Sequence, residues 1–137
     1  MNTKMYKSLL AGVIGTIIMT IVMMIAPMMG IPKMSPPAML ANMLSMPLMV
    51  GWLMHFMIGI IFAIAYTYLF APKVKIGNIF LKGAIFGFVV FIFAQIMMAI
   101  MGAMLPMPKF DGSMMLMIGS IMGHIIYGIS VSRTVNY

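Results

Sequence analysis

The sequence predicts an all-α membrane protein, a bundle of four transmembrane helices in one membrane domain that covers residues 1–137. Three observations support this fold class. Hydrophobic residues make up 64% of the 137-residue chain. Charged residues make up only 7%. The apolar residues form four long stretches, separated by breaks that contain proline. A soluble chain of this length could not bury so much apolar surface, so lipid must surround most of the side chains.

Each apolar stretch is long enough to be a transmembrane helix. Crossing ~30 Å of hydrocarbon takes roughly 20 helical residues. The four stretches are about 8–30, 47–70, 79–105 and 113–132. They show no alternation of apolar and polar residues, which favours helices over the strands of a barrel.

The first stretch follows two lysines, Lys4 and Lys7, and so resembles a secretory signal. It is too long for the apolar core of a signal, and no small-residue cleavage site follows it, so we interpret it as the first span. Pro27 lacks a backbone N–H and should kink this helix near its outer end. Residues 37–46 are enough for a short helix at the outer surface.

The basic residues predict that both chain ends face the cytoplasm (N-in/C-in). Six of them fall on the side of the chain ends: Lys4, Lys7, Lys73, Lys75, Lys82 and Arg133. Only Lys33 and Lys109 fall on the other side, together with the single acid, Asp111. An excess of Lys and Arg marks the cytoplasmic side, so we expect a multi-pass protein of the cell inner membrane. The net charge of +7 indicates an anionic membrane surface and not nucleic acid.

The chain contains an internal repeat, in which residues of about 8–70 match residues of about 79–132. The first and third spans match at an offset of 72, through the pairs Ala11–Gly83, Gly15–Gly87, Met23–Gln95 and Gly30–Gly102. The second and fourth spans match at an offset of 69, through the pairs Gly51–Ser120, His55–His124, Gly59–Gly128 and Ala63–Ser132. Each unit holds two spans, so both insert the same way, and we expect a pseudo-two-fold axis along the membrane normal.

Three motifs resemble those of an uncharacterised family of small bacterial and archaeal four-helix membrane proteins. They are Gly12-x-x-Gly15-Thr16, Trp52-x-x-His55-x-x-x-Gly59 and Gly123-His124-x-x-Tyr127-Gly128. The resemblance covers most of the chain. It implies the four-helix architecture and no established activity.

Each span carries one polar residue at a similar depth in the outer half of the membrane. These residues are Thr20, His55, Gln95 and His124. Titratable residues at membrane depth are rare and often functional. Small residues lie four positions before and after each histidine, on the same helix face. They are Gly51 and Gly59 around His55, and Ser120 and Gly128 around His124.

These faces have two interpretations. They make room for a flat ligand such as haem or a quinone, with imidazole as the axial ligand or hydrogen-bond partner. The cofactor-binding residues would then be His55, His124, Gly51, Gly59, Gly128, Tyr127 and Gln95. Alternatively, the small residues let two helices approach closely, and each histidine bonds to a carbonyl, to Tyr127 or to Gln95. Direct packing of the two faces would bring Gly59 and Gly128 to a contact between the second and fourth helices.

The 23 methionines are distributed unevenly along the spans. Apart from Met1 and Met5, all lie at or outside the depth of the histidines. A generic packing residue should occur on both sides. Thioethers are soft ligands that select Cu(I), and imidazole also suits copper. The sequence therefore predicts a metal site at His55, His124, Met54, Met23 and Met122, open to the outer side.

We therefore expect a non-enzymatic membrane subunit that binds copper or haem b and is accessory to a respiratory membrane complex. One alternative is a structural or assembly subunit that docks a larger membrane partner through its methionine-rich outer face. Another is a small homodimeric transporter. In each case the protein would work in the lipid bilayer as a homo-oligomer or in a larger complex. The chain has no cysteine and one acid, so thiolate chemistry and paired-carboxylate catalysis are excluded.

Overall fold

The computed structural model of the chain describes residues 3–104 and 113–135. Within these ranges the fold is helical and contains no strand. The first helix, α1 (Thr3–Ile25), runs into the 3-10 turn η1 (Ala26–Met29), and the short helix α2 (Pro36–Met43) follows. The second long helix, α3 (Leu48–Ala65), continues through the π-helical turn η2 (Tyr66–Phe70) into α4 (Ala71–Lys73). The last two are α5 (Ile79–Met104) and α6 (Met114–Val135).

The prediction of four long apolar helices is confirmed. The segments Thr3–Met29, Leu48–Lys73, Ile79–Met104 and Met114–Val135 are each long and apolar enough to cross a membrane. The first begins five residues before the apolar stretch, so it includes both Lys4 and Lys7. The methylene groups of a lysine side chain can lie along an apolar surface while its ammonium group stays in water. A membrane-spanning helix can therefore include lysines in its first turns.

The predicted kink at Pro27 is replaced by a change of helix type. The α-helix ends at Ile25, and residues 26–29 form the 3-10 turn with the proline in its first positions. A proline there removes no hydrogen bond, because the first N–H groups of a helix have no partner within it. Gly30 ends the turn with φ +83°, in the left-handed region that glycine favours.

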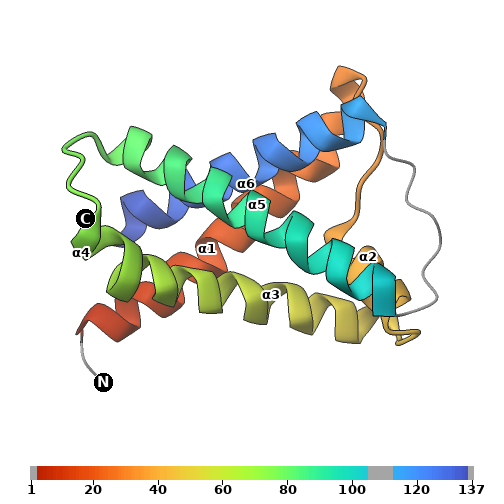
Figure 1. The fold of residues 1–137 in the computed structure, drawn as a ribbon, viewed down its shortest axis with the longest axis horizontal. Coiled ribbons are helices and arrows are strands. Elements are labelled where there is room, and N and C mark those ends of the chain that lie inside the picture. The colour runs from red at the N-terminus through yellow and green to blue at the C-terminus, as the bar shows by residue number, and fades with distance from the viewer. Residues whose placement is uncertain (1–2, 105–112, 136–137) are drawn as a thin grey trace.

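The long helices pack in the order α5, α6, α1 and α3, and α2 lies against α3. The start of α1 and the end of α6 lie at one end of the bundle, and α2 lies at the other (Figure 1). Glycine permits the closest contacts. A Cβ atom on Gly12 of α1 would lie 2.5 Å from Ile60 Cα of α3. A Cβ atom on Gly83 of α5 would lie 2.6 Å from Ile129 Cα of α6. Apolar helices have no hydrophobic drive to associate in lipid, so such close backbone contact is a main source of their packing energy.

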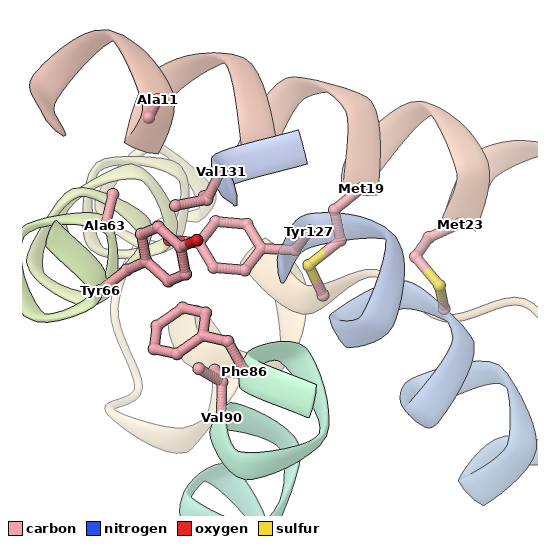
Figure 2. Close-up of a cluster of buried hydrophobic side chains, with 9 residues drawn as sticks. All are labelled: Ala11, Met19, Met23, Ala63, Tyr66, Phe86, Val90, Tyr127 and Val131. Carbon is pink, nitrogen blue, oxygen red and sulfur yellow. The ribbon is translucent and has the colours of Figure 1, made fainter. Parts of the chain in front are cut away.

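The core of the bundle is built around three aromatic side chains, Tyr66, Phe86 and Tyr127 (Figure 2). The rings of Tyr66 and Phe86 meet edge to face, with centroids 4.9 Å apart. Both tyrosines also bind neighbouring helices. The Tyr66 hydroxyl lies 2.6 Å from Ser132 Oγ, which donates to the Ile79 carbonyl at 3.0 Å. The core therefore joins η2, α5 and α6 through polar as well as apolar contacts.

Candidate functional site

His55 lies on α3 and is held by a hydroxyl from α1. It is 8% exposed, and its Nε2 atom lies 3.1 Å from Thr20 Oγ1. Thr20 donates its only hydroxyl proton to the Thr16 carbonyl, at 2.7 Å. The Thr20 oxygen must therefore accept from the imidazole, so His55 carries its proton on Nε2. This leaves the lone pair of Nδ1 free for a ligand.

His124 lies on α6 and uses its other ring nitrogen. Its Nδ1 atom lies 2.7 Å from the Ser120 carbonyl, one turn earlier on the same helix. A carbonyl can only accept, so Nδ1 carries the proton and Nε2 the lone pair. Phe91 of α5 contacts the imidazole edge to face, with ring centroids 5.9 Å apart. Donation from one ring nitrogen to a carbonyl is the arrangement that orients a metal-binding histidine.

Within the described ranges no group of three His, Cys, Asp or Glu residues could hold a metal ion. The histidines therefore need other atoms to complete a metal site.

The small residues beside the histidines contact neighbouring backbone and side chains. A Cβ atom on Gly51 would collide with the Pro37 carbonyl of α2. One on Gly59 would collide with Thr16 Oγ1 of α1. One on Gly128 would lie 2.5 Å from the Gly87 nitrogen of α5. Each of these three glycines is therefore covered by a neighbouring helix, and the interpretation as a haem site stays a prediction.

The contact between Gly59 and Gly128 that direct packing of the two faces would bring is not formed. Gly59 packs against α1 and Gly128 against α5, because α3 and α6 are separated by α1 in the order of the bundle. Tyr127 spans this separation. Its ring lies against Gly15 of α1, where a Cβ atom would be 3.0 Å from the ring, and its hydroxyl donates to the Gly59 carbonyl.

The remaining predicted site residues lie in different surroundings. Gln95 is exposed on α5, and Tyr127 is bonded to Gly59 and not to an imidazole. Met54 and Met122 are half-buried, whereas Met23 is buried. The polar layer therefore consists of one pair across helices, Thr20 with His55, and one histidine bonded within its own helix.

Three methionines converge on α6 within two turns before His124. Met19 and Met23 are 8% and 1% exposed and project from one face of α1 toward α6 (Figure 2). A Cβ atom on Gly123 would lie 2.9 Å from Met23 Sδ and 3.5 Å from Met19 Cε. One on Gly119 would lie 3.9 Å from both Met23 Cε and Met34 Sδ. We refer to Met19, Met23 and Met34 as the methionine cluster.

Sequence reasoning missed the part of Met34 in this cluster. It lies in the irregular segment between η1 and α2, so no helical period points to it. Gly119 and Gly123 are the signal that was available. Glycines four residues apart leave a groove on one helix face, which long flexible side chains from a neighbour can fill.

Most other methionines face away from the protein. Exposed ones on the described helices and loops are Met24, Met28, Met29, Met46, Met49, Met57, Met97, Met104, Met114, Met115 and Met117. They include Met57 and Met97, which follow His55 and Gln95 by two residues on the same helices.

Residues 2–137 match the model of a family of unknown function (DUF6789), and the chain belongs to that family. No curated protein and no solved structure matches the chain.

Proposed function

We propose that this member of the DUF6789 family is a non-enzymatic membrane protein that binds Cu(I) at the methionine cluster beside His124. The observation that carries the proposal is the convergence of three thioethers on Gly119 and Gly123, immediately before a histidine with an available lone pair. Thioethers are soft ligands and select Cu(I) over hard cations. Imidazole is a compatible additional ligand.

The burial of the cluster suits this role. Met19 and Met23 are almost without exposed surface, so a bound ion would be shielded from water and from hard ligands. Exposed Met24, Met28 and Met29 follow on α1 and η1 and would serve as transient ligands on the way in.

The proposed orientation has both chain ends in the cytoplasm and the methionines on the outer side of the cell inner membrane. Its support is the excess of Lys and Arg at the end of the bundle that holds the start of α1 and the end of α6. A role as an accessory of a respiratory membrane complex belongs to the same proposal, because such complexes use copper.

The proposed internal repeat is supported by equivalent contacts in the two halves. Gly12 meets Ile60 as Gly83 meets Ile129. Thr20 contacts His55 as Phe91 contacts His124. These pairs relate α3 to α6 by 69 residues, the offset seen in the sequence. They relate α1 to α5 by 71 residues, one fewer than the 72 of the sequence match.

A second candidate function is a structural or assembly subunit that docks a larger membrane partner. The exposed methionines favour it, because Met49, Met104 and Met114 are about four-fifths exposed and make an adaptable apolar surface.

Competition for Cu(I) against a calibrated chelator separates the two functions. We expect wild-type protein to bind with a dissociation constant below about 1 μM. The double variant Met19→Leu/Met23→Leu should bind at least about 10-fold more weakly. Leucine keeps the volume and apolarity but cannot ligate, at a packing cost below about 1.5 kcal/mol. The matched control is Met49→Leu/Met104→Leu, which removes two exposed thioethers and should bind as the wild type does. Equal binding by all three proteins would contradict the copper site and favour docking.

A further inference from the structure

An apolar groove separates α3 and α5 on the outside of the bundle. The rings of Phe62 and Phe93 bridge the two helices with centroids 5.5 Å apart, and those of Phe70 and Phe86 do so at 5.1 Å. Between them lies a space of about 260 Å³ with apolar lining throughout. It is smaller than the roughly 300–1,000 Å³ of a pocket for a drug-sized molecule, so a narrow chain suits it better than a ring system.

The groove lies toward the end of the bundle where α5 starts. Its lining on α5 runs from Phe86 to Phe93, seven and fourteen residues after the start of the helix at Ile79. At ~1.5 Å per residue this is about 10 to 21 Å from the helix start. The hydrocarbon core is about 30 Å thick, so this depth matches an acyl chain that begins at the end of the bundle where α5 starts. Leu69 and Val89 line the groove and are about half exposed or more, so it opens toward lipid.

Cationic side chains lie at the mouth of the groove. Lys82 is one turn before Phe86 on α5, and its Nζ atom donates to the Ala71 carbonyl at 2.8 Å. Ala71 directly follows Phe70, which lines the groove. An ammonium group has three donors, so Lys82 keeps two for another acceptor. Lys73 is exposed two residues after Ala71. An anion at this place would complement two positive charges.

The groove wall on the α3 side is irregular. Leu69 and Phe70 belong to the π-helical turn η2. Such turns widen a helix by one residue and are frequent at functional sites. The ring of Phe70, in this turn, packs against Phe86 of α5.

We propose that this groove is a binding site for one anionic phospholipid. One acyl chain lies between α3 and α5, and the phosphate is bound by Lys73 and Lys82. The site is independent of the proposed copper site, because the groove begins at the end of the bundle opposite to α2 and involves no methionine.

Native mass spectrometry of the detergent-purified protein tests the proposal. The probes are phosphatidylglycerol and phosphatidylcholine with identical acyl chains. We expect one phosphatidylglycerol to be retained with about 30-fold preference, the selectivity of two lysines that contribute about 1 kcal/mol each. Lys73→Gln/Lys82→Gln should remove the preference, while glutamine can still donate to the Ala71 carbonyl. Ala65→Phe should fill the groove and prevent retention of either lipid.

Two matched controls locate the effect. Lys33→Gln removes a lysine far from the groove and should leave the preference unchanged. Lys7→Gln changes a hollow of about 550 Å³ between α1 and α6, lined also by Arg133, at the same end of the bundle. Loss of preference in Lys7→Gln alone would place the anion in that hollow and overturn the proposal. Equal retention of the two lipids by the wild type, no retention at all, or a retained lipid in Ala65→Phe would overturn it as well. A dimer that excludes lipid and dissociates in Ala65→Phe would make the groove an interface between copies.

Discussion

The two histidines differ in the ring nitrogen that each uses for its hydrogen bond. The donation of Thr20 to Thr16 makes the threonine oxygen an acceptor for His55. His124 donates to a carbonyl of its own helix. A neutral imidazole has one N–H donor and one lone pair. The lone pair is on Nδ1 of His55 and on Nε2 of His124.

Nitrogen chemical shifts of the two histidines check this assignment. In protein labelled with ¹⁵N-histidine, we expect one Nε2–H tautomer and one Nδ1–H tautomer. The His55→Gln variant should lose the first signal and the His124→Gln variant the second. Two Nε2–H signals would contradict the hydrogen bond from His124 to Ser120.

Tyr127 gives a second test at the scale of a residue. Tyr127→Phe keeps the ring against Gly15 and removes the hydroxyl that donates to Gly59. Hydrogen bonds between membrane helices contribute about 0.6 kcal/mol on average and up to about 1.7. We expect unfolding in mixed micelles to show a loss of this size. A variant as stable as the wild type would mean that the bond from Tyr127 to Gly59 contributes nothing to stability.

Most residues of the candidate site could be predicted from the sequence, whereas the residues that they contact could not. Both histidines, Tyr127 and the asymmetry of the methionines are visible in the printed sequence. The partners depend on which helices are neighbours, and apolar helices carry little signal for this. Gln95 illustrates the limit: its depth matches that of the histidines, yet it is exposed on α5. The depth of a residue in the membrane can be predicted by counting residues along the helix. Whether its side chain faces the bundle or the lipid depends on how the helices pack.

Glycine residues allow the backbones of α5 and α6 to approach each other closely. At Gly87 of α5 a Cβ atom would lie 2.7 Å from Ile125 Cα of α6. Neither helix can rotate to relieve such a collision without losing the other glycine contacts. The positions of small residues therefore set the distance between these helices.

Gly128→Ala should separate α5 from α6. The added methyl would meet the Gly83 carbonyl and the Gly87 backbone, so the helices must move apart. Overpacking of this kind costs about 1–3 kcal/mol. Thermal unfolding in detergent should show a lower midpoint for Gly128→Ala. The control is Gly77→Ala, where nothing lies within 4 Å of the added Cβ atom, and its stability should change by no more than about 0.5 kcal/mol. Equal midpoints for the two variants would contradict the close contact.

Some features of the elements could be predicted and others could not. The four spans and the short helix near residues 37–46 follow from hydropathy and from the placement of prolines. The π-helical turn at Tyr66–Phe70 could not be predicted from either, because one extra residue in a helical turn does not change the composition of the sequence. The 3-10 turn after Ile25 could not be predicted because the effect of a proline depends on where the helix begins. Proline interrupts a helix interior but is accepted in a first turn.

The proposed repeat explains why one side of the bundle is closed and another is open. It would make the α1–α6 contact equivalent to that between α5 and α3. Gly15 admits Tyr127 to the first contact. At the 71-residue offset of the equivalent contacts, Phe86 of α5 corresponds to Gly15, and its ring fills the space against Tyr66 and Phe70. The second contact therefore stays wide and leaves the groove.

Orientation is a prediction about the whole molecule. The chain has no cysteine, so single cysteines report their own accessibility. Thr3→Cys, at the start of α1, should be shielded from an impermeant thiol reagent added outside intact cells. Ser35→Cys, at the other end of the bundle, should be labelled. Labelling of Thr3→Cys from outside, with Ser35→Cys protected, would reverse the orientation and turn the methionines toward the cytoplasm.

X-ray absorption of the Cu(I)-loaded protein tests the proposed copper site, because it reports which atoms surround the metal. We expect a shell dominated by sulfur with a nitrogen contribution. Met19→Leu/Met23→Leu should reduce the sulfur contribution and His124→Ala the nitrogen contribution, since each variant removes its own ligand. The control variant Met49→Leu/Met104→Leu changes two exposed methionines and should leave the ligand shell of the metal unchanged. A shell of nitrogen and oxygen that is identical in all four proteins would contradict the account.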